Sequence, residues 1–317
     1  MVILGSRLRR GASEWDKASI FFDVPDRNLT GEQVFTDDDG TMFHFNGVEA
    51  AGTWADLVMI LRTSSDNGAT WSKPRLINPH HQFMNQVISC TIKTSKGYYI
   101  QCCDAGPGGN GGTCIHVSKD GGNTWVNPTG DKIRANFVEG GKGNLIAGIH
   151  ASVVELTDGS LLAFGRKNDI NGFMPRSISR DLGKSWTYSA SEFLGLTSGQ
   201  RMVLRRLKEG PILFVSFCTD DRGTAWEGED FPGMPTYKVE KKDGTVEELY
   251  GAFVAVSFDE GNTWPIKKGL GDDFDEEVVL NTIRKRTFVL DRTHGPPLGY
   301  LAATQTVSYT HLTLPTN

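Results

Sequence analysis

Three side chains of this chain could combine proton transfer with anion binding: His150, Arg166 and Tyr300. A tyrosine with an ordinary pKa of about 10 needs a neighbouring base before its oxygen can attack a carbon atom, and a histidine can take that proton near neutral pH. The same pair would suit β-elimination, in which one residue removes a proton beside a carboxylate and the other protonates the leaving oxygen. Arg166 could bind a carboxylate in either reaction, because its planar guanidinium donates two parallel hydrogen bonds.

Each of the three also has a structural interpretation. Tyr300 could be a packed core aromatic, and His150 could be a satisfied interior histidine in an apolar, strand-like run. Arg166 could form a surface ion pair beside the polar residues that follow it. The chemistry therefore depends on the elements that position these side chains.

A repeated octapeptide of the form S-x-D-x-G-x-[ST]-W predicts those elements. Its four copies start 54 to 78 residues apart, at Ser64, Ser118, Ser179 and Ser257. Within each copy the aspartate can accept hydrogen bonds from its own tight turn, the glycine permits a positive φ, and the tryptophan supplies a large apolar surface. We therefore interpret the four aspartates as structural rather than catalytic or calcium-binding; they are Asp66, Asp120, Asp181 and Asp259.

Strand-like runs accompany the repeats. Residues 56–62, 113–117 and 252–256 directly precede three copies, and residues 152–155 and 161–166 flank an Asp-Gly turn upstream of the other. One hairpin every 50 to 80 residues cannot bury its own apolar face, so several small sheets must pack around a common axis. The pattern predicts an all-β protein, specifically a β-propeller.

The octapeptide is the Asp-box, or BNR repeat, and the chain resembles the sialidase (neuraminidase) superfamily over residues 28–306. The resemblance implies a six-bladed β-propeller whose active site lies at the central axis, on the face opposite the boxes. It also implies an arginine triad for the substrate carboxylate, a tyrosine nucleophile with a glutamate partner, and an aspartate acid/base. The last blade is expected to be incomplete.

Three of these roles fall on the residues introduced above. Arg166 ends the strand that returns from the V-V-E-L-T-D-G turn, where the superfamily has a triad arginine. His150 stands where the superfamily has its glutamate, so the resemblance implies a histidine as the base partner. Tyr300, in the run G-Y-L-A-A-T, is the counterpart of the nucleophile.

The remaining roles are matched less closely. Arg222 is the expected third arginine, with Arg201 and Arg205 as alternatives, and the first arginine of the triad has no counterpart. For the acid/base we prefer Glu49 to Asp56, because Glu49 lies in a glycine-flanked stretch.

The function implied is that of a sialidase-like glycoside hydrolase acting on an acidic sugar, with a glycan as its partner. Two alternatives remain open: a uronate polysaccharide lyase that uses His150 and Tyr300, and a propeller that binds glycans without turnover.

Composition argues against other classes of function. Lys and Arg number 33 against 38 Asp and Glu, giving a net charge of −5 without a basic block, so nucleic acid is a poor candidate partner. No apolar run reaches the roughly 18 residues of a membrane-spanning helix. The five cysteines lack paired C-x-x-C spacing, so we predict no metal site and no cofactor. We interpret them mainly as small buried hydrophobes, with one disulfide left open.

The two ends depart from the repeat pattern. Residues 1–27 are expected to form a separate N-terminal segment, and residues 307–317 a non-native tail outside the fold. Residues 1–11 lack the order of charge and apolar residues that a signal peptide has. The resemblance implies secretion or a periplasmic location, which the sequence leaves undecided.

Overall fold

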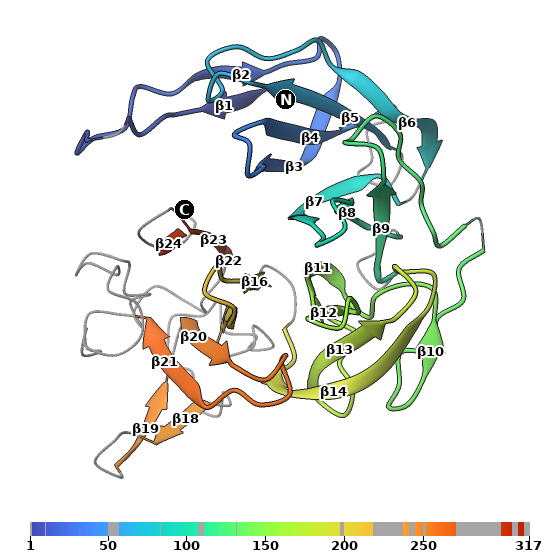
Figure 1. The fold of residues 1–317 in the computed structure, drawn as a ribbon, viewed down its shortest axis with the longest axis vertical. Helices are drawn as coiled ribbons and strands as arrows, with labels where there is room; N and C mark the ends of the chain where they lie inside the picture. Colours follow the sequence, from blue (N-terminus) through green and yellow to red (C-terminus); the bar gives the residue numbers. More distant parts are fainter. Residues whose placement is uncertain are drawn as a thin grey trace, which may run out of the picture.

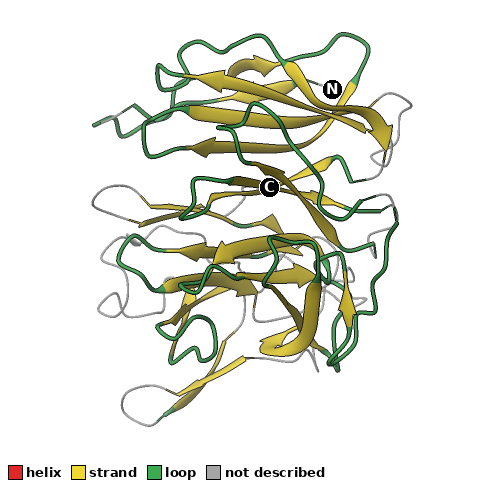
Figure 2. Ribbon diagram, turned by 45° about the vertical axis from the view of Figure 1, so that its right-hand side comes forward, coloured by secondary structure: helices red, strands yellow, loops and turns green. Residues whose placement is uncertain are grey.

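The structure is a computed structural model. It describes residues 2–9, 11–49, 57–82, 84–106, 111–130, 132–196, 200–217, 237–240, 245–249, 252–270, 299–305 and 310–313. All regular elements in these residues are strands, so the chain is all-β as predicted, and no α-helix occurs in the described ranges. In Figure 2 the strands lie side by side within each sheet, and most of the loops and turns that connect them lie at the two ends of the strands.

Four antiparallel sheets form the body of the molecule. The first has the order β3 (Asn28–Thr36), β4 (Met42–Glu49), β5 (Leu57–Ser64), β6 (Arg75–Gln82). The second has the order β7 (Gln86–Lys93), β8 (Tyr99–Asp104), β9 (Thr113–Ser118). The third has the order β11 (Ile149–Glu155), β12 (Leu161–Arg166), β13 (Phe173–Ser179), β14 (Trp186–Leu194), β10 (Lys142–Gly143). The fourth has the order β16 (Val203–Arg206), β17 (Ile212–Phe217), β20 (Ala252–Ser257), β21 (Ile266–Leu270).

Four two-stranded pairs complete the described strands. Three of them are antiparallel: β1 (Ile3–Gly5) with β2 (Ser19–Phe22), β18 (Tyr237–Glu240) with β19 (Val246–Leu249), and β23 (Ala302–Gln305) with β24 (Thr310–Thr313). The other is parallel and joins β15 (Gln200–Arg201) to β22 (Gly299–Tyr300). Strands β1 and β2 lie within residues 1–27, and β24 lies within residues 307–317.

The four sheets follow one another around a common centre (Figure 1). Each sheet turns its first strand inward, and these inner strands are in contact in chain order: β3 with β7, β7 with β11, and β11 with β16, which in turn contacts β23. The described strands do not close this arrangement into a complete ring, so the expected number of six blades is not established by it.

Successive strands within each sheet are antiparallel, so the connections between them alternate between the two ends of the sheet. The four Asp-box turns follow β5, β9, β13 and β20, the third strand of each sheet, and they share one end, which we call the box end. The opposite end, the far end, carries the start of each inner strand and the end of each second strand. Glu49, Asp104 and Arg166 are the last residues of β4, β8 and β12, so all three lie at the far end.

The Asp-box turns use their carboxylates internally. Each aspartate accepts hydrogen bonds from the backbone N–H and the hydroxyl of the Thr or Ser four residues later, and from the serine that starts the box. The box glycine has a φ between 75° and 86° in all four copies. The threonine hydroxyl bonds, followed by the backbone bonds, lower the pKa of Asp66, Asp120 and Asp259 to about 2. These carboxylates thus hold the turns as anions.

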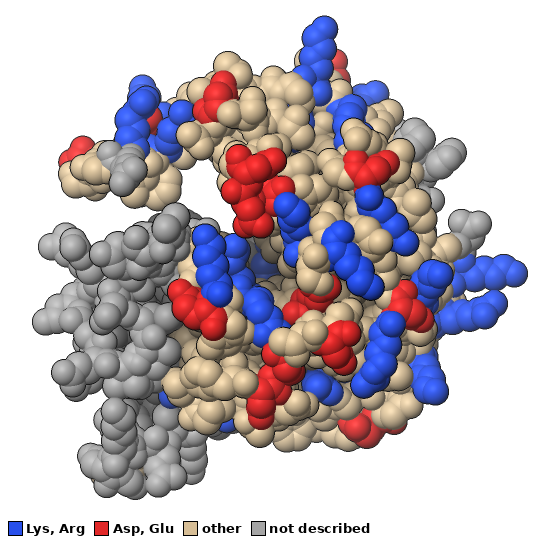
Figure 3. Space-filling view, in the orientation of Figure 1, with Lys and Arg blue, Asp and Glu red and all other residues tan. Residues whose placement is uncertain are grey.

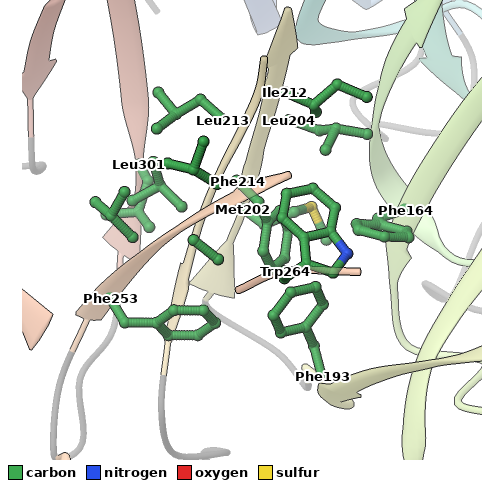
Figure 4. Close-up of a cluster of buried hydrophobic side chains, with 14 of the residues drawn as sticks. Phe164, Phe193, Met202, Leu204, Ile212, Leu213, Phe214, Phe253, Trp264 and Leu301 are labelled. Atoms are coloured by element: carbon green, nitrogen blue, oxygen red, sulfur yellow. The ribbon is translucent and has the colours of Figure 1, made fainter. Parts of the chain in front are cut away.

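The box tryptophans pack each sheet onto the one before it. Trp125 meets Phe45 of the first sheet edge to face at 5.3 Å between ring centroids. Trp264 lies 6.0 Å from Phe164 of the third sheet, within a buried aromatic cluster that also contains Phe193 (Figure 4). The repeated tryptophan is therefore part of the apolar contact between neighbouring sheets.

The β1–β2 hairpin occupies the corresponding place before the first sheet. Trp71, the tryptophan of the first box, meets Phe21 of β2 edge to face at 5.3 Å. Arg62 lies over the rings of Phe21, Phe22 and Trp71, with its guanidinium carbon 4.4 to 5.1 Å from their centroids. Its Nε donates to Nδ1 of His44 at 3.0 Å. The hairpin is thereby fixed to the first sheet by cation–π contacts as well as apolar packing.

Cysteines of the second sheet contribute to the apolar core that this sheet shares with its neighbours. Cys90, Cys102, Cys103 and Cys114 are buried free thiols, in agreement with their interpretation as small hydrophobes. Cys218 lies outside the described residues.

Candidate functional site

A bulge in β11 directs His150 toward the centre of the far end. Strand β11 pairs with β12 through Ile149 and Arg166, and the regular register resumes only at Ser152. His150 within this irregularity has a φ of 49°, which is uncommon for a residue other than glycine. On the partner strand, a Cβ at Gly165 would collide with the carbonyl oxygen of Ala147, so only glycine allows the two backbones to approach this closely.

The imidazole of His150 lies between a cation and an anion. Its Nδ1 is 3.1 Å from Nη2 of Arg201, and its Nε2 is 3.4 Å from Oδ2 of Asp104. Burial, followed by the positive charges of Arg201, Arg166 and Lys167, lowers the pKa of His150 to about 2. The ring is therefore neutral at physiological pH, and Nδ1 faces an N–H donor.

Asp104 is a buried carboxylate, 4% exposed, at the end of β8. Its Oδ1 accepts the backbone N–H of His150 at 2.7 Å and the hydroxyl of Thr113 at 3.4 Å. Burial raises the pKa of Asp104 to about 6, against the opposing effects of the His150 hydrogen bond and of the charges on Arg201 and Arg166. Asp104 thus titrates close to neutral pH inside the site.

Two arginines, Arg166 and Arg201, lie at strand β15. Arg166 is buried, 5% exposed, and its Nη1 donates to the carbonyl oxygen of Gln200 at 2.9 Å. Arg201 is half-buried, and its Nη1 donates to Oγ of Ser89 on β7 at 2.6 Å. Arg201 also contacts His150, and the charges of both Arg166 and Arg201 act on His150 and Asp104, so the four side chains form one cluster. We call these four residues the His150 cluster. Its members come from the second and third sheets and from β15.

The backbone of Tyr300 reaches the same cluster. Strand β22 runs parallel to β15 with Tyr300 opposite Arg201, and the N–H of Leu301 donates to the carbonyl oxygen of Arg201 at 3.3 Å. The side chain of Tyr300 lies outside the described residues. The structure therefore brings His150, Arg166, Arg201 and the backbone of Tyr300 together, although they are up to 150 residues apart in the chain.

Glu49 lies at the far end but has different neighbours. Its carboxylate is buried, 3% exposed, and accepts hydrogen bonds from Nδ2 of Asn28 at 2.9 Å and from the hydroxyl of Thr30, both on β3. Among the described contacts, none joins Glu49 to the His150 cluster. Arg205 also points elsewhere, with its Nη1 donating to the carbonyl oxygen of Ala303. Arg222 and Asp56 lie outside the described residues.

Sequence reasoning missed Asp104 and ranked Arg201 below Arg222. A positional signal could have identified Asp104: Glu49, Asp104 and Arg166 each end the second strand of their sheets, so the three occupy equivalent places. The alternative interpretation of Arg166 as a surface residue is wrong, because the side chain is buried.

The cluster offers charge for an anionic ligand rather than donors for a metal. Its four side chains include two guanidinium groups, which do not ligate cations. The described residues contain no group of three or more His, Cys, Asp or Glu that could hold a metal ion. Figure 3 shows a hollow at the centre of the arrangement of sheets, bordered by both basic and acidic side chains.

The described part of the chain contains no helix that is long and apolar enough to cross a membrane.

Comparisons with known proteins place this geometry in context. A family described as "BNR repeat-like domain" matches residues 1–265. A solved structure of a protein of unknown function from Dyadobacter fermentans is similar, with 16% identity and a TM-score of 0.54 over 85% of this chain and 72% of that one. The NanB sialidase from Streptococcus pneumoniae is similar as well, with 12% identity and a TM-score of 0.55 over 84% of this chain and 56% of that one. Likeness at this identity shows a shared fold. A comparison with curated proteins gave no match.

Proposed function

The chain belongs to the BNR repeat-like family, within the sialidase-like BNR-repeat superfamily, and from that premise we propose that it is a glycoside hydrolase acting on an acidic sugar. The observation that carries the proposal is the His150 cluster. Arg166 donates to the carbonyl oxygen of Gln200, and the next residue, Arg201, contacts His150 and is paired with the backbone of Tyr300, so both arginines lie at this part of the far end. A pair of arginines in a largely buried site is suited to a carboxylate ligand.

We assign Arg166 and Arg201 to the carboxylate of the sugar, with Arg222 kept as a further candidate. The position of the cluster supports this assignment, because the box turns occupy the opposite end of the sheets and their carboxylates are already used internally. At the far end, by contrast, Arg166, Arg201 and the backbone of Tyr300 come together.

We assign Tyr300 as the nucleophile and Glu49 as the acid/base. The phenolate oxygen of Tyr300, its proton having passed to solvent, would form a bond to the anomeric carbon while the glycosidic bond breaks, and the leaving oxygen would take the proton from Glu49. Water would then attack the anomeric carbon, release Tyr300 and return the proton to Glu49. The backbone pairing of Tyr300 with Arg201 across β22 and β15 supports placing Tyr300 at the same site as the arginines.

His150 suits a supporting role better than the role of base that the sequence predicted. Its Nδ1 already faces a donor on Arg201, and burial with three nearby cations holds its pKa low. A group with so low a pKa is a weak proton acceptor at neutral pH. The same consideration counts against a lyase in which His150 removes a proton.

We further propose that the complete fold is a six-bladed β-propeller. The packing of the box tryptophans supports this, because Trp125 and Trp264 contact the preceding sheet and Trp71 contacts the β1–β2 hairpin in the same way. In this proposal β1 and β2 belong to the blade that precedes the first sheet, together with strands from the other end of the chain. Residues 1–27 would then be part of the propeller rather than a separate segment.

The test is release of a fluorogenic aglycone from a sialoside by the purified protein. We expect Tyr300→Phe to abolish release, and Tyr98→Phe, at a half-buried tyrosine in the β7–β8 turn at the box end, to leave it unchanged. Arg201→Lys should raise KM, whereas Arg180→Lys, at an exposed box position, should not.

Other outcomes would overturn the proposal. Absence of release at high protein concentration would exclude sialidase activity. A product with the ultraviolet absorbance of an unsaturated uronate, formed from a uronate polysaccharide, would favour the lyase. Glycan binding without any turnover, unaffected by Tyr300→Phe, would indicate a binding protein.

A further inference from the structure

Asp104 contacts His150 at two points, which is more than burial of a carboxylate requires. Its Oδ1 accepts the backbone N–H of His150 at 2.7 Å, and its Oδ2 lies 3.4 Å from Nε2 of the ring. The first contact stabilises the bulge in which His150 has a positive φ, and the second faces the imidazole itself. One carboxylate thus controls both the backbone and the ring of His150.

The contacts of the ring fix its tautomer. Arg201 has only N–H groups to offer, so Nδ1 of His150 at 3.1 Å from Nη2 must be unprotonated and accept. A neutral imidazole carries one proton, which must then be on Nε2, facing the Asp104 carboxylate. The order of groups is therefore carboxylate, imidazole N–H, imidazole lone pair and guanidinium.

The order holds only while Asp104 presents an acceptor to Nε2. If that acceptor were replaced by a donor, the proton would move to Nδ1 and would face the N–H groups of Arg201. The guanidinium would lose its acceptor on the ring and keep the hydroxyl of Ser89 as its partner on the other side. The orientation of Arg201 would then lose the contribution of His150.

We propose that Asp104 is a positioning residue that acts through the tautomer of His150 to orient Arg201 for the carboxylate of an acidic sugar. This rests on the proposed function for its ligand class. It goes beyond that function because it assigns a role to Asp104. Neither the repeats nor the superfamily resemblance indicates a functional residue at that position. An imidazole at position 150 can pass the orientation from a carboxylate to an arginine, which an ionised glutamate could not do because it has no proton to donate.

The first test needs no activity and uses nitrogen chemical shifts of the imidazole rings in ¹⁵N-labelled protein. The chain has seven histidines, and the signals of His150 are identified by their loss in His150→Asn. In the unsubstituted protein at pH 8 we expect His150 with its proton on Nε2. In Asp104→Asn, which keeps an oxygen for the backbone N–H but offers an amide donor to the ring, we expect the proton on Nδ1.

Two results would overturn the proposal in this test. One is a His150 whose proton is on Nδ1 in the unsubstituted protein, and the other is a tautomer that Asp104→Asn does not change. Asp158→Asn, at the turn between β11 and β12 at the box end, is the control and should leave the His150 signals in place.

The second test is a double-mutant cycle on KM for the fluorogenic sialoside. Asp104→Asn should raise KM about tenfold, the ratio that corresponds to loss of one charged hydrogen bond, and should change kcat less. His150→Asn suits the positive φ and retains an oxygen near the place of Nδ1; its backbone N–H can still donate to Asp104, but its side chain has no atom at the place of Nε2 to contact Asp104. In the His150→Asn background, Asp104→Asn should therefore have little further effect on KM.

Equal effects of Asp104→Asn in both backgrounds would overturn the proposal, because they would mean that Asp104 acts without His150. The two proposals fail differently. If no sialoside is cleaved but the tautomer changes as expected, the proposed function fails and the positioning role of Asp104 is retained. If the sialoside is cleaved and the tautomer does not change, the reverse holds.

Discussion

Asp37 offers a sensitive test of how neighbouring sheets are held together. It follows β3 in the first sheet, and its carboxylate accepts hydrogen bonds from Nζ of Lys93 at 2.8 and 2.9 Å and from the hydroxyl of Tyr99 at 2.6 Å, both in the second sheet. Asp37 and Tyr99 are buried. We predict that Asp37→Asn, which preserves shape but removes the charge, destabilises the protein because both bonds across the sheets weaken.

The size of the effect follows from these contacts. A hydrogen bond to a charged group contributes about 1.5–3 kcal/mol, and the asparagine oxygen would restore roughly half of the Tyr99 contribution. The side chain of Lys93 is 32% exposed, so its contribution is that of a surface pair, about 0–1 kcal/mol. We expect the free energy of unfolding to fall by about 2 kcal/mol and Tm by about 4–8 °C.

The pH dependence adds a second criterion. Burial raises the pKa of Asp37, but the hydrogen bonds from Lys93 and Tyr99 outweigh burial and bring the pKa below its ordinary value of 3.8. A carboxylate whose pKa is lower in the folded state stabilises the protein above its ordinary pKa, and this contribution is lost as pH falls through the folded value. The difference between the two proteins should be full at pH 7 and shrink below pH 3.8.

Urea unfolding followed by tryptophan fluorescence at pH 7 and at lower pH measures both quantities. Asp38→Asn is the matched control, because Asp38 is exposed in the same turn. A loss of stability no larger than that of the control, or a difference that does not change with pH, would refute this account of the contact between the sheets.

Three further substitutions test other parts of the structure. Arg62→Met should lower the free energy of unfolding by about 2–4 kcal/mol, because it removes three cation–π contacts and the N–H donor to Nδ1 of His44. The β1–β2 hairpin should also become more sensitive to limited proteolysis. Unchanged cleavage would count against the proposed attachment of the hairpin to the first sheet through Arg62. Glu260→Gln should lower Tm by roughly 1–3 °C, because it weakens the salt bridge, made of two hydrogen bonds, with the partly exposed Arg206. The decrease in Tm should be smaller in high salt, and a decrease that does not depend on salt would point to another cause. Gly165→Ala should lower the free energy of thermal unfolding by about 1–3 kcal/mol, because the added methyl group must push away the carbonyl oxygen of Ala147 beside the bulge. It should also weaken carboxylate binding. Unchanged stability would refute the close approach of Gly165 to Ala147.

The repeats allowed much of the fold to be predicted from sequence. The S-x-D-x-G-x-[ST]-W turns occur where the pattern placed them, and strands β9, β12 and β20 cover the expected runs. A turn of this kind depends only on hydrogen bonds within eight residues, so its local sequence is sufficient to specify it. The joining of β15 to β22 could not be predicted, because it pairs residues about 100 positions apart without a pattern in either segment.

The site was predictable only in part. His150 and Arg166 share one hairpin, so the spacing of the resemblance carried both to the same place. Asp104 and Arg201 reach His150 from other elements through the way the inner strands are arranged around the centre, which spacing along the chain does not reveal. The low pKa of His150 likewise depends on burial and on cations from two segments, Arg201 and the pair Arg166 and Lys167.

The most direct test of the central claim is a crystal structure of the protein with an acidic monosaccharide, sialic acid or glucuronic acid, soaked at the far end of the sheets. The account predicts the sugar carboxylate within hydrogen-bonding distance of both Arg166 and Arg201, with His150 still between Arg201 and Asp104. A sugar bound at the box end, or a carboxylate that contacts neither arginine, would contradict it.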